Sequence, residues 1–269
     1  MPPDEQARHW LPSATSECPV ELDKQRWIES SLRWFTDQFG TSALSRDTVP
    51  PDADFVSGKS YSGSHAQIEE LLTRLCGLMP VDPATVSLEL ADGEAADPRV
   101  LSAIAVHELC HVLIQDRADR DRVDRADRDR ADGDRLADLL SVYFGFGVFS
   151  TNAAMRFATL NATRNEGYHR LGYLSSTEWG YALACYSWLR REKEPGWARH
   201  LDPGPRVYLE QGLAYLSRTS ADGQLPTQRL LDKQVRIGDV TVRVTRGAIL
   251  GPGPLGLMFP GASQAGGTN

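Results

Sequence analysis

The chain has 269 residues and a formal net charge of −7 at pH 7, with 41% hydrophobic and 24% charged residues. These proportions are ordinary for a water-soluble globular protein that is long enough to bury a sizeable core. The acidic balance argues against nucleic acid as the main partner, because binding phosphates requires a basic face. The longest apolar stretch, residues 139–149, is too short to span a bilayer, so no membrane partner is expected.

The cysteines and the first residues indicate the compartment. The four cysteines lie far apart and form no CxxC pair, which favours neither a zinc knuckle nor a disulfide scaffold. The N-terminal residues lack the basic and apolar regions of a secretory signal. We therefore expect a cytoplasmic protein.

Hydrophobic spacing predicts mostly helical structure within one domain, residues 21–250. A flexible arm is expected before it, at 1–20, and a disordered Gly/Pro-rich tail after it, at 251–269. Apolar residues recur three and four apart, as in amphipathic helices, over 21–39, 64–78, 97–115, 135–149, 151–160, 177–191 and 205–216. Alternation at 86–90, and at 235–244 around a Gly-Asp turn, predicts a small β-sheet. The predicted class is α+β, mostly helical.

A low-complexity insert interrupts the domain at 116–135. The octet RADRDRVD is followed directly by RADRDRAD, so aspartate and arginine alternate along most of the insert. Such patterning is typical of a solvated surface connection. A docking or regulatory arm is the alternative interpretation.

The segment 100–115 contains the candidate metal-binding and catalytic residues. It reads VLSAIAVHELCHVLIQ and holds an HExxH pattern formed by His107, Glu108 and His111. On a helix, residues four apart share one face, so both imidazoles can bind one metal ion. The carboxylate of Glu108 can take a proton from a water at that metal. Asp97-Pro98 is a good helix start, and the apolar residues around the motif predict a buried helix.

A catalytic zinc site needs a third protein ligand and an open position for water. In gluzincin metallopeptidases a second helix supplies a glutamate in an ExxxD pattern, and its aspartate orients a ligand histidine. Here the similar pattern is DxxxD, from Asp134 to Asp138, at the start of an apolar helix. We favour Asp134 as the ligand and Asp138 as its hydrogen-bonding support. Asp138 as the third ligand is the alternative.

The strings HELCH, DRLADLLSVYFGFGVFSTN and GYLSSTEWGYALACYSWLR resemble an uncharacterised group of bacterial, gluzincin-like HExxH proteins. The resemblance runs from about residue 55 to 216. It implies a zincin-like helical core and the activity of a zinc metallopeptidase. The group's pattern has glutamate at the position of Asp134 and a shorter acidic linker in place of the Asp/Arg octets.

The expected function is therefore peptide-bond hydrolysis with one Zn²⁺ and Glu108 as the general base. A donor for the developing oxyanion would complete the site. His169, Tyr173 and Tyr181 are candidates, because they lie in the downstream part of the resemblance. The alternative for each tyrosine is a core or half-buried aromatic residue, and the alternative for His169 is a surface residue. The alternative is a non-catalytic metal-binding or regulatory module that uses the same HExxH site. The peptide or protein substrate and the oligomeric state are not indicated by the sequence.

Overall fold

The structure, a computed structural model, describes residues 17–49, 62–86, 98–120, 130–164, 172–220 and 224–226. Every regular element in these ranges is a helix. The α-helices are α1 (Leu22–Phe39), α2 (His65–Leu78), α3 (Pro98–Arg120), α4 (Arg130–Tyr143), α5 (Gly147–Arg164), α6 (Ser176–Leu189) and α7 (Pro203–Thr219). Short 3-10 helices form at Thr41–Ser45 (η1), Pro83–Thr85 (η2) and Gly196–His200 (η3).

The α+β prediction is wrong for the described part of the chain, which contains no strand and whose regular elements are all helices; the prediction of mostly helical structure is confirmed there. Val86 is extended, with φ −129° and ψ 146°, but it pairs with no neighbouring strand. The rest of the first predicted strand, 87–90, and the second, 235–244, lie outside the described residues. The error has a physical reason, since alternation over five residues is a weak signal when no partner strand is identified.

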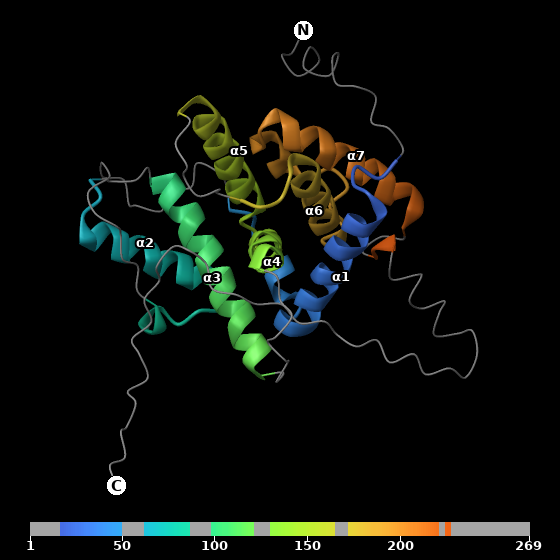
Figure 1. The fold of residues 1–269 in the computed structure, drawn as a ribbon. Helices are drawn as coiled ribbons and strands as arrows, with labels where there is room; N and C mark the ends of the chain where they lie inside the picture. The colour runs from blue at the N-terminus through green and yellow to red at the C-terminus, as the bar shows by residue number, and fades with distance from the viewer. Residues whose placement is uncertain are drawn as a thin grey trace.

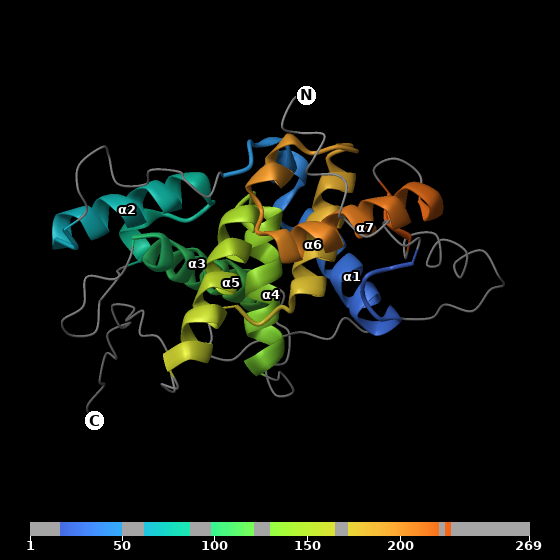
Figure 2. The ribbon, with the colours of Figure 1, turned by 90° about the horizontal axis from the view of Figure 1, so that it is seen from above.

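Helix α4 lies at the centre of the fold and is seen nearly end-on in Figure 1. It packs against α1, α3, α5 and α6. Its side chains from Leu136 to Tyr143 are almost fully buried, as expected for a helix that is apolar around its whole circumference. The view from above shows α3, α4 and α5 side by side (Figure 2). The central helix therefore offers the DxxxD pattern to its neighbours rather than to solvent.

The predicted helix over 135–149 is interrupted in the structure. Helix α4 ends at Tyr143 and α5 begins at Gly147. Gly145 between them has φ +90°, a conformation that costs other residues free energy. Its Cβ, if present, would also lie 3.3 Å from the carbonyl oxygen of Asp47. The two glycines of the GFG sequence therefore turn the chain from the central helix into α5.

The predicted bounds of the N-terminal arm (1–20) and of the insert (116–135) differ from the structure. Residues 17–20, assigned to the arm, pack on α7, where Gln211 donates a hydrogen bond to the Glu17 carbonyl. Residues 116–120 continue α3, and 130–135 belong to α4. Residues 1–16, 121–129 and the predicted tail lie outside the described residues. The two helices therefore extend into the Asp/Arg-rich segment from both sides.

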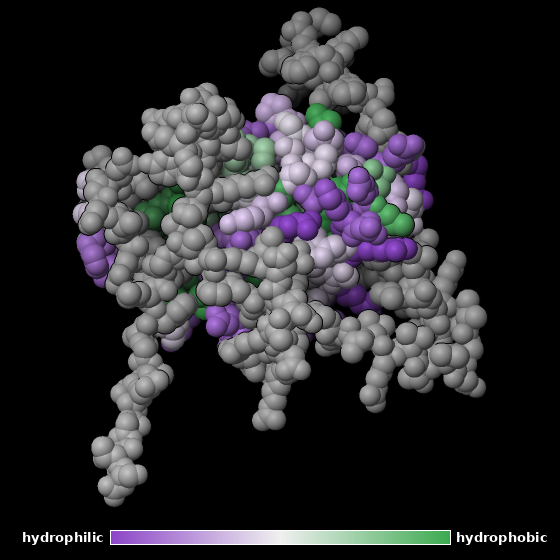
Figure 3. Space-filling model, in the orientation of Figure 1, coloured by the Kyte–Doolittle hydropathy of each residue, from purple (hydrophilic) through white to green (hydrophobic). Residues whose placement is uncertain are grey.

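The surface of the described residues is mostly hydrophilic over α1, α6 and α7 (Figure 3). Leu22 and Leu78 are the large apolar residues that are exposed in the described part of the chain. No helix among the described residues is long and apolar enough to cross a bilayer.

Helices α6 and α7 approach each other closely because small residues lie at their crossing. A Cβ on Gly180 of α6 would lie 2.4 Å from the Tyr208 Cβ and 2.8 Å from the Pro205 carbonyl oxygen on α7. A Cβ on Gly212 of α7 would lie 2.6 Å from the Ala184 Cβ of α6. These two glycines allow the backbones of α6 and α7 to come into contact. The contact buries the face of α6 that lies against α7.

Gly180→Ala should lower the free energy of unfolding by about 2–3 kcal/mol, because backbone atoms of α7 must move to admit the methyl group. The matched control is Gly77→Ala on α2, where a Cβ meets nothing within 4 Å. There the helix propensity of alanine should stabilise the protein by roughly 0.5–1 kcal/mol. Urea unfolding measures both changes. Equal effects of the two substitutions would contradict the close α6–α7 packing.

Candidate metal centre

Two helices place four chemically active side chains against one another. His107 and His111 are one turn apart on α3, and Asp134 and Asp138 are one turn apart on α4. Because α3 packs on α4, the two faces meet. Each pair owes its common face to its four-residue spacing. All four side chains are buried or largely buried, between 5% and 14% exposed.

Three donor atoms converge on one point. The Nε2 atoms of His107 and His111 are 3.2 Å apart, and Asp134 Oδ1 lies 3.1 Å from the second and 3.9 Å from the first. A tetrahedral ion with ligands at about 2.0–2.1 Å separates neighbouring donors by about 3.3–3.4 Å. Two sides of the observed triangle are close to this length, and the side from Asp134 to His107 is longer, at 3.9 Å. His107, His111 and Asp134 therefore form a group that can hold a metal ion.

Asp138 contacts the far side of the His107 ring. Its Oδ1 lies 2.9 Å from His107 Nδ1, while its Oδ2 accepts the backbone N–H groups of Tyr173 (2.6 Å) and Leu174 (3.2 Å). A hydrogen on Nδ1 leaves the lone pair of Nε2 free for a metal. The geometry thus favours Asp138 as the residue that orients His107, and places Asp134 with the donors.

The charges of the group are strongly coupled. Burial disfavours the charged form of His107, but the neighbouring carboxylates of Asp134 and Asp138 outweigh it and raise the pKa of His107 to about 10. Burial and the charge of His107 lower the pKa of His111 to about 4. Burial opposes ionisation of Asp134, yet the nearby His107 and His111 hold its pKa below the usual range. Metal binding would release the proton on His107.

Glu108 follows the first ligand and is 9% exposed. Burial raises the pKa of its carboxyl group above the ordinary value, and the charge of His107 partly offsets this. Within the described residues its carboxylate makes no hydrogen bond or ion pair with another group. A carboxylate that is not committed to a protein partner can bind a water beside the ligand group.

The structure places the candidate oxyanion donors differently relative to the ligand group. The ring of Tyr173 stacks on that of His107, with centroids 5.9 Å apart, and its side chain hydrogen-bonds to Asp134. Tyr181 is fully buried, and its hydroxyl donates to Glu29 Oε1 at 2.6 Å, so this hydroxyl already has a core partner. His169 lies outside the described residues. The structure therefore brings Tyr173, but not Tyr181, to the ligand group.

Sequence reasoning missed Gly172, which allows the Tyr173–Leu174 backbone to reach Asp138. Gly172 has φ +84°, and a Cβ there would lie 2.6 Å from the Ala154 Cβ of α5. Only glycine satisfies both conditions without movement. The sequence signal is a glycine five residues before the predicted helix over 177–191. Its partners are 18 and 34 residues away, so local spacing did not connect them.

Arg135, next to Asp134, fixes the start of the DxxxD segment. Its Nη2 donates to Glu178 Oε1 at 2.7 Å, and its guanidinium lies 4.5 Å above the ring of Trp27. Glu178 also forms a capping box with Ser175 at the start of α6. One buried carboxylate therefore joins α4 to α6 beside the metal ligands.

No protein-family model matches the chain, and no curated protein or solved structure matches it significantly. The inference that the group can hold a metal ion therefore depends on the geometry of this chain alone.

Substituting the two aspartates tests their different positions. Asp134→Ala removes one of three donors and should lower zinc affinity by at least about a thousandfold. Asp138→Ala keeps all three donors and should weaken binding by about 10–100-fold, as loss of an orienting partner does. Competition with a chromophoric chelator measures both. A larger loss with Asp138→Ala would identify Asp138 as the ligand instead.

Glu178→Gln should lower the free energy of unfolding by about 1–3 kcal/mol at pH 7, because a charge-assisted pair is lost. Burial opposes the charge of Glu178, but hydrogen bonds from Ser175 and the charge of Arg135 keep its pKa below the ordinary 4.5. A lowered folded pKa stabilises the protein above the unfolded pKa and loses this effect as pH falls through the folded value.

The difference between wild type and Glu178→Gln should therefore be constant at neutral pH and shrink below about pH 4.5. Glu70→Gln is the control, since its pair with Arg74 is half exposed and should contribute at most about 0.5 kcal/mol. Denaturant titrations from pH 7 to pH 3 measure both. A difference that grows on acidification would contradict the assigned role of Glu178.

Proposed function

We propose that this protein is a zinc-dependent metallopeptidase. The observation that carries the proposal is the donor triangle of His107, His111 and Asp134, two sides of which are close to those of a tetrahedral zinc site. Two imidazole nitrogens and one carboxylate oxygen are donors that zinc accepts. The HExxH spacing adds a carboxylate at the position of a general base.

A zinc ion bound there would leave one position open for water and would supply Lewis acidity toward a substrate carbonyl. The protein residues carry out the proton transfers. Glu108 accepts a proton from the attacking water and donates it to the leaving amine. Burial raises its pKa above the ordinary value, which makes the protonated form more available as the donor to the leaving amine. No other described side chain at the ligand group is free for this role.

Tyr173 is the proposed oxyanion donor. Its ring lies against His107 and its side chain contacts Asp134, so its hydroxyl belongs to the edge of the ligand group. When the carbonyl oxygen gains charge, this hydroxyl can exchange its hydrogen bond with Asp134 for one to that oxygen. The substrate class is a peptide or a protein, and the proposed location is the cytoplasm.

A non-catalytic metal-binding module is the second candidate, and one observation favours it. The described cavity lined by His107 and Asp138 has a volume of about 10 Å³, enough for about one water molecule. A peptidase needs room for a substrate chain beside its metal. In the regulatory alternative the metal stabilises a conformation, and Glu108 has no chemical task.

Glu108→Gln distinguishes the two functions. For a peptidase, the variant should bind about one zinc ion per chain, as the wild type does, and lose at least about a thousandfold in peptide hydrolysis, since Gln cannot accept the proton. Zinc is measured by atomic absorption and hydrolysis with a mixed peptide library analysed by mass spectrometry. His107→Ala is the control that loses both. Wild-type protein that is folded and binds zinc but cleaves no peptide would favour the module.

A further inference from the structure

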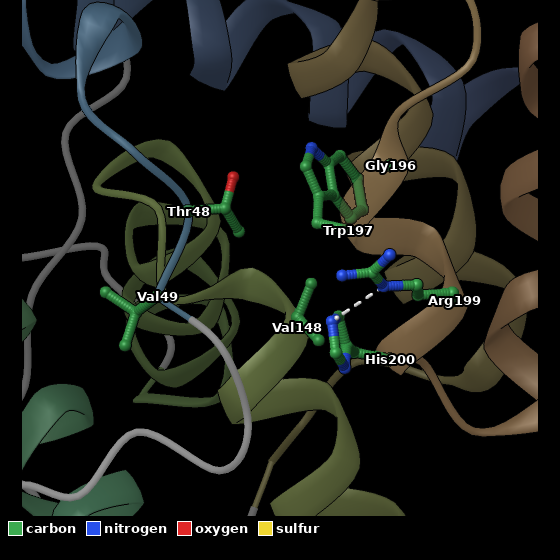
Figure 4. A pocket seen from close by; sticks show the side chains of 7 residues that line it. All are labelled: Thr48, Val49, Val148, Gly196, Trp197, Arg199 and His200. Carbon is green, nitrogen blue, oxygen red and sulfur yellow. Dashed lines mark hydrogen bonds between the residues drawn. The ribbon is translucent and has the colours of Figure 1, made fainter.

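A second hollow lies apart from the metal group, with a volume of about 230 Å³ (Figure 4). Thr48 and Val49, just after η1, form one side. Val148 at the start of α5 forms the base. The facing side belongs to η3 and consists of Trp197, Arg199 and His200. This volume is somewhat below the range of about 300–1,000 Å³ that suits drug-sized ligands, so the hollow fits a smaller molecule.

The hollow is positively charged within an acidic protein. None of the described residues that line it is acidic, although the whole chain has a net charge of −7. Arg199 forms no ion pair with a carboxylate in the described ranges, and its Nε donates to His200 Nε2 at 3.1 Å. Arg206, behind η3, donates to the carbonyl oxygens of Leu201 and Arg199 and likewise pairs with no described carboxylate. Two guanidinium charges therefore remain uncompensated here.

The η3 side presents hydrogen-bond donors. Because His200 Nε2 accepts the bond from Arg199, the hydrogen of the neutral ring is on Nδ1. The terminal nitrogens of Arg199 add further N–H donors in a planar fork, which matches the two oxygens of a carboxylate. Figure 4 shows this guanidinium directed into the hollow, between Trp197 and His200.

Contacts from neighbouring elements hold this side in place. The Asn152 side chain on α5 donates to the His200 carbonyl at 2.7 Å and accepts the Asp202 N–H at 2.9 Å. Trp197 Nε1 donates to Glu192, whose charge is paired with Arg190. A binding surface that is ordered before the ligand arrives costs less entropy to complete.

We propose that this hollow binds a small organic carboxylate with an apolar or aromatic body. Arg199 and His200 hold the carboxylate, while Val49, Val148 and the Trp197 indole contact the body. Inorganic phosphate would leave the apolar surfaces without a contact, so a carboxylate on an apolar group fits better. The hollow is separate from the metal group: Val148 of α5 lines it, whereas Ala154 of the same helix lines the small cavity beside His107.

The proposal can be tested with benzoate as the probe and 5-fluorotryptophan as the label. Of the six tryptophan ¹⁹F resonances, the one absent from Trp197→Phe should shift and saturate at millimolar benzoate. Benzamide, which has nearly the same shape without the charge, should bind at least about tenfold more weakly. Arg199→Gln should raise the benzoate Kd about tenfold or more, since a charged hydrogen bond is lost.

Arg33→Gln is the matched control, because Arg33 is exposed on α1 and lines no part of the hollow; it should leave the benzoate Kd unchanged. Thermal unfolding verifies that each variant folds. The proposal fails if benzoate leaves the Trp197 resonance unmoved, if benzamide binds equally well, or if folded Arg199→Gln binds as the wild type does. A larger shift with inorganic phosphate than with benzoate would also reject it. These outcomes are independent of zinc and of Glu108.

Discussion

The hydrogen bond between His107 Nδ1 and Asp138 Oδ1 joins α3 to α4 at the place where the metal group forms. It fixes the ring plane of His107 and leaves Nε2 directed toward His111 and Asp134. The carboxylate of Asp138 is itself fixed by two backbone N–H groups of the segment that leads into α6. Three segments far apart in the sequence therefore determine the orientation of one imidazole.

This arrangement places carboxylates in the interior, which is costly unless each one is compensated. Asp134 and Asp138 are both 4% exposed and both contact His107. Glu178, equally buried, is compensated by Arg135 and by its capping box. A divalent cation between the histidines would add the positive charge that the two aspartates favour. The same central helix α4 thus supplies core packing along most of its length and, with Asp134, one member of the group that can hold a metal ion.

Much of this site could be predicted from local spacing, because two four-residue intervals on helices fix two faces. The spacing of His107 and His111, and of Asp134 and Asp138, required only that both segments be helical. What sequence spacing did not reveal is nonlocal: the positive φ of Gly172, its close contact with Ala154, and the hydrogen bond from Tyr181 to Glu29. The β-sheet prediction failed in the described ranges for a related reason, since a strand depends on a partner that short alternation does not identify.

Aspartate at position 134 has a geometric consequence. Its side chain is one methylene shorter than the glutamate of the pattern that this chain resembles, yet its Oδ1 already lies 3.1 Å from His111 Nε2. The donor triangle is therefore closed by the approach of α4 to α3 rather than by a longer side chain. That approach depends on the Asp138–His107 bond and on Arg135–Glu178, which secures the first turns of α4 from the other side. The shorter side chain of Asp134 and the contacts that hold α4 against α3 thus act together to place Oδ1 beside the two histidines.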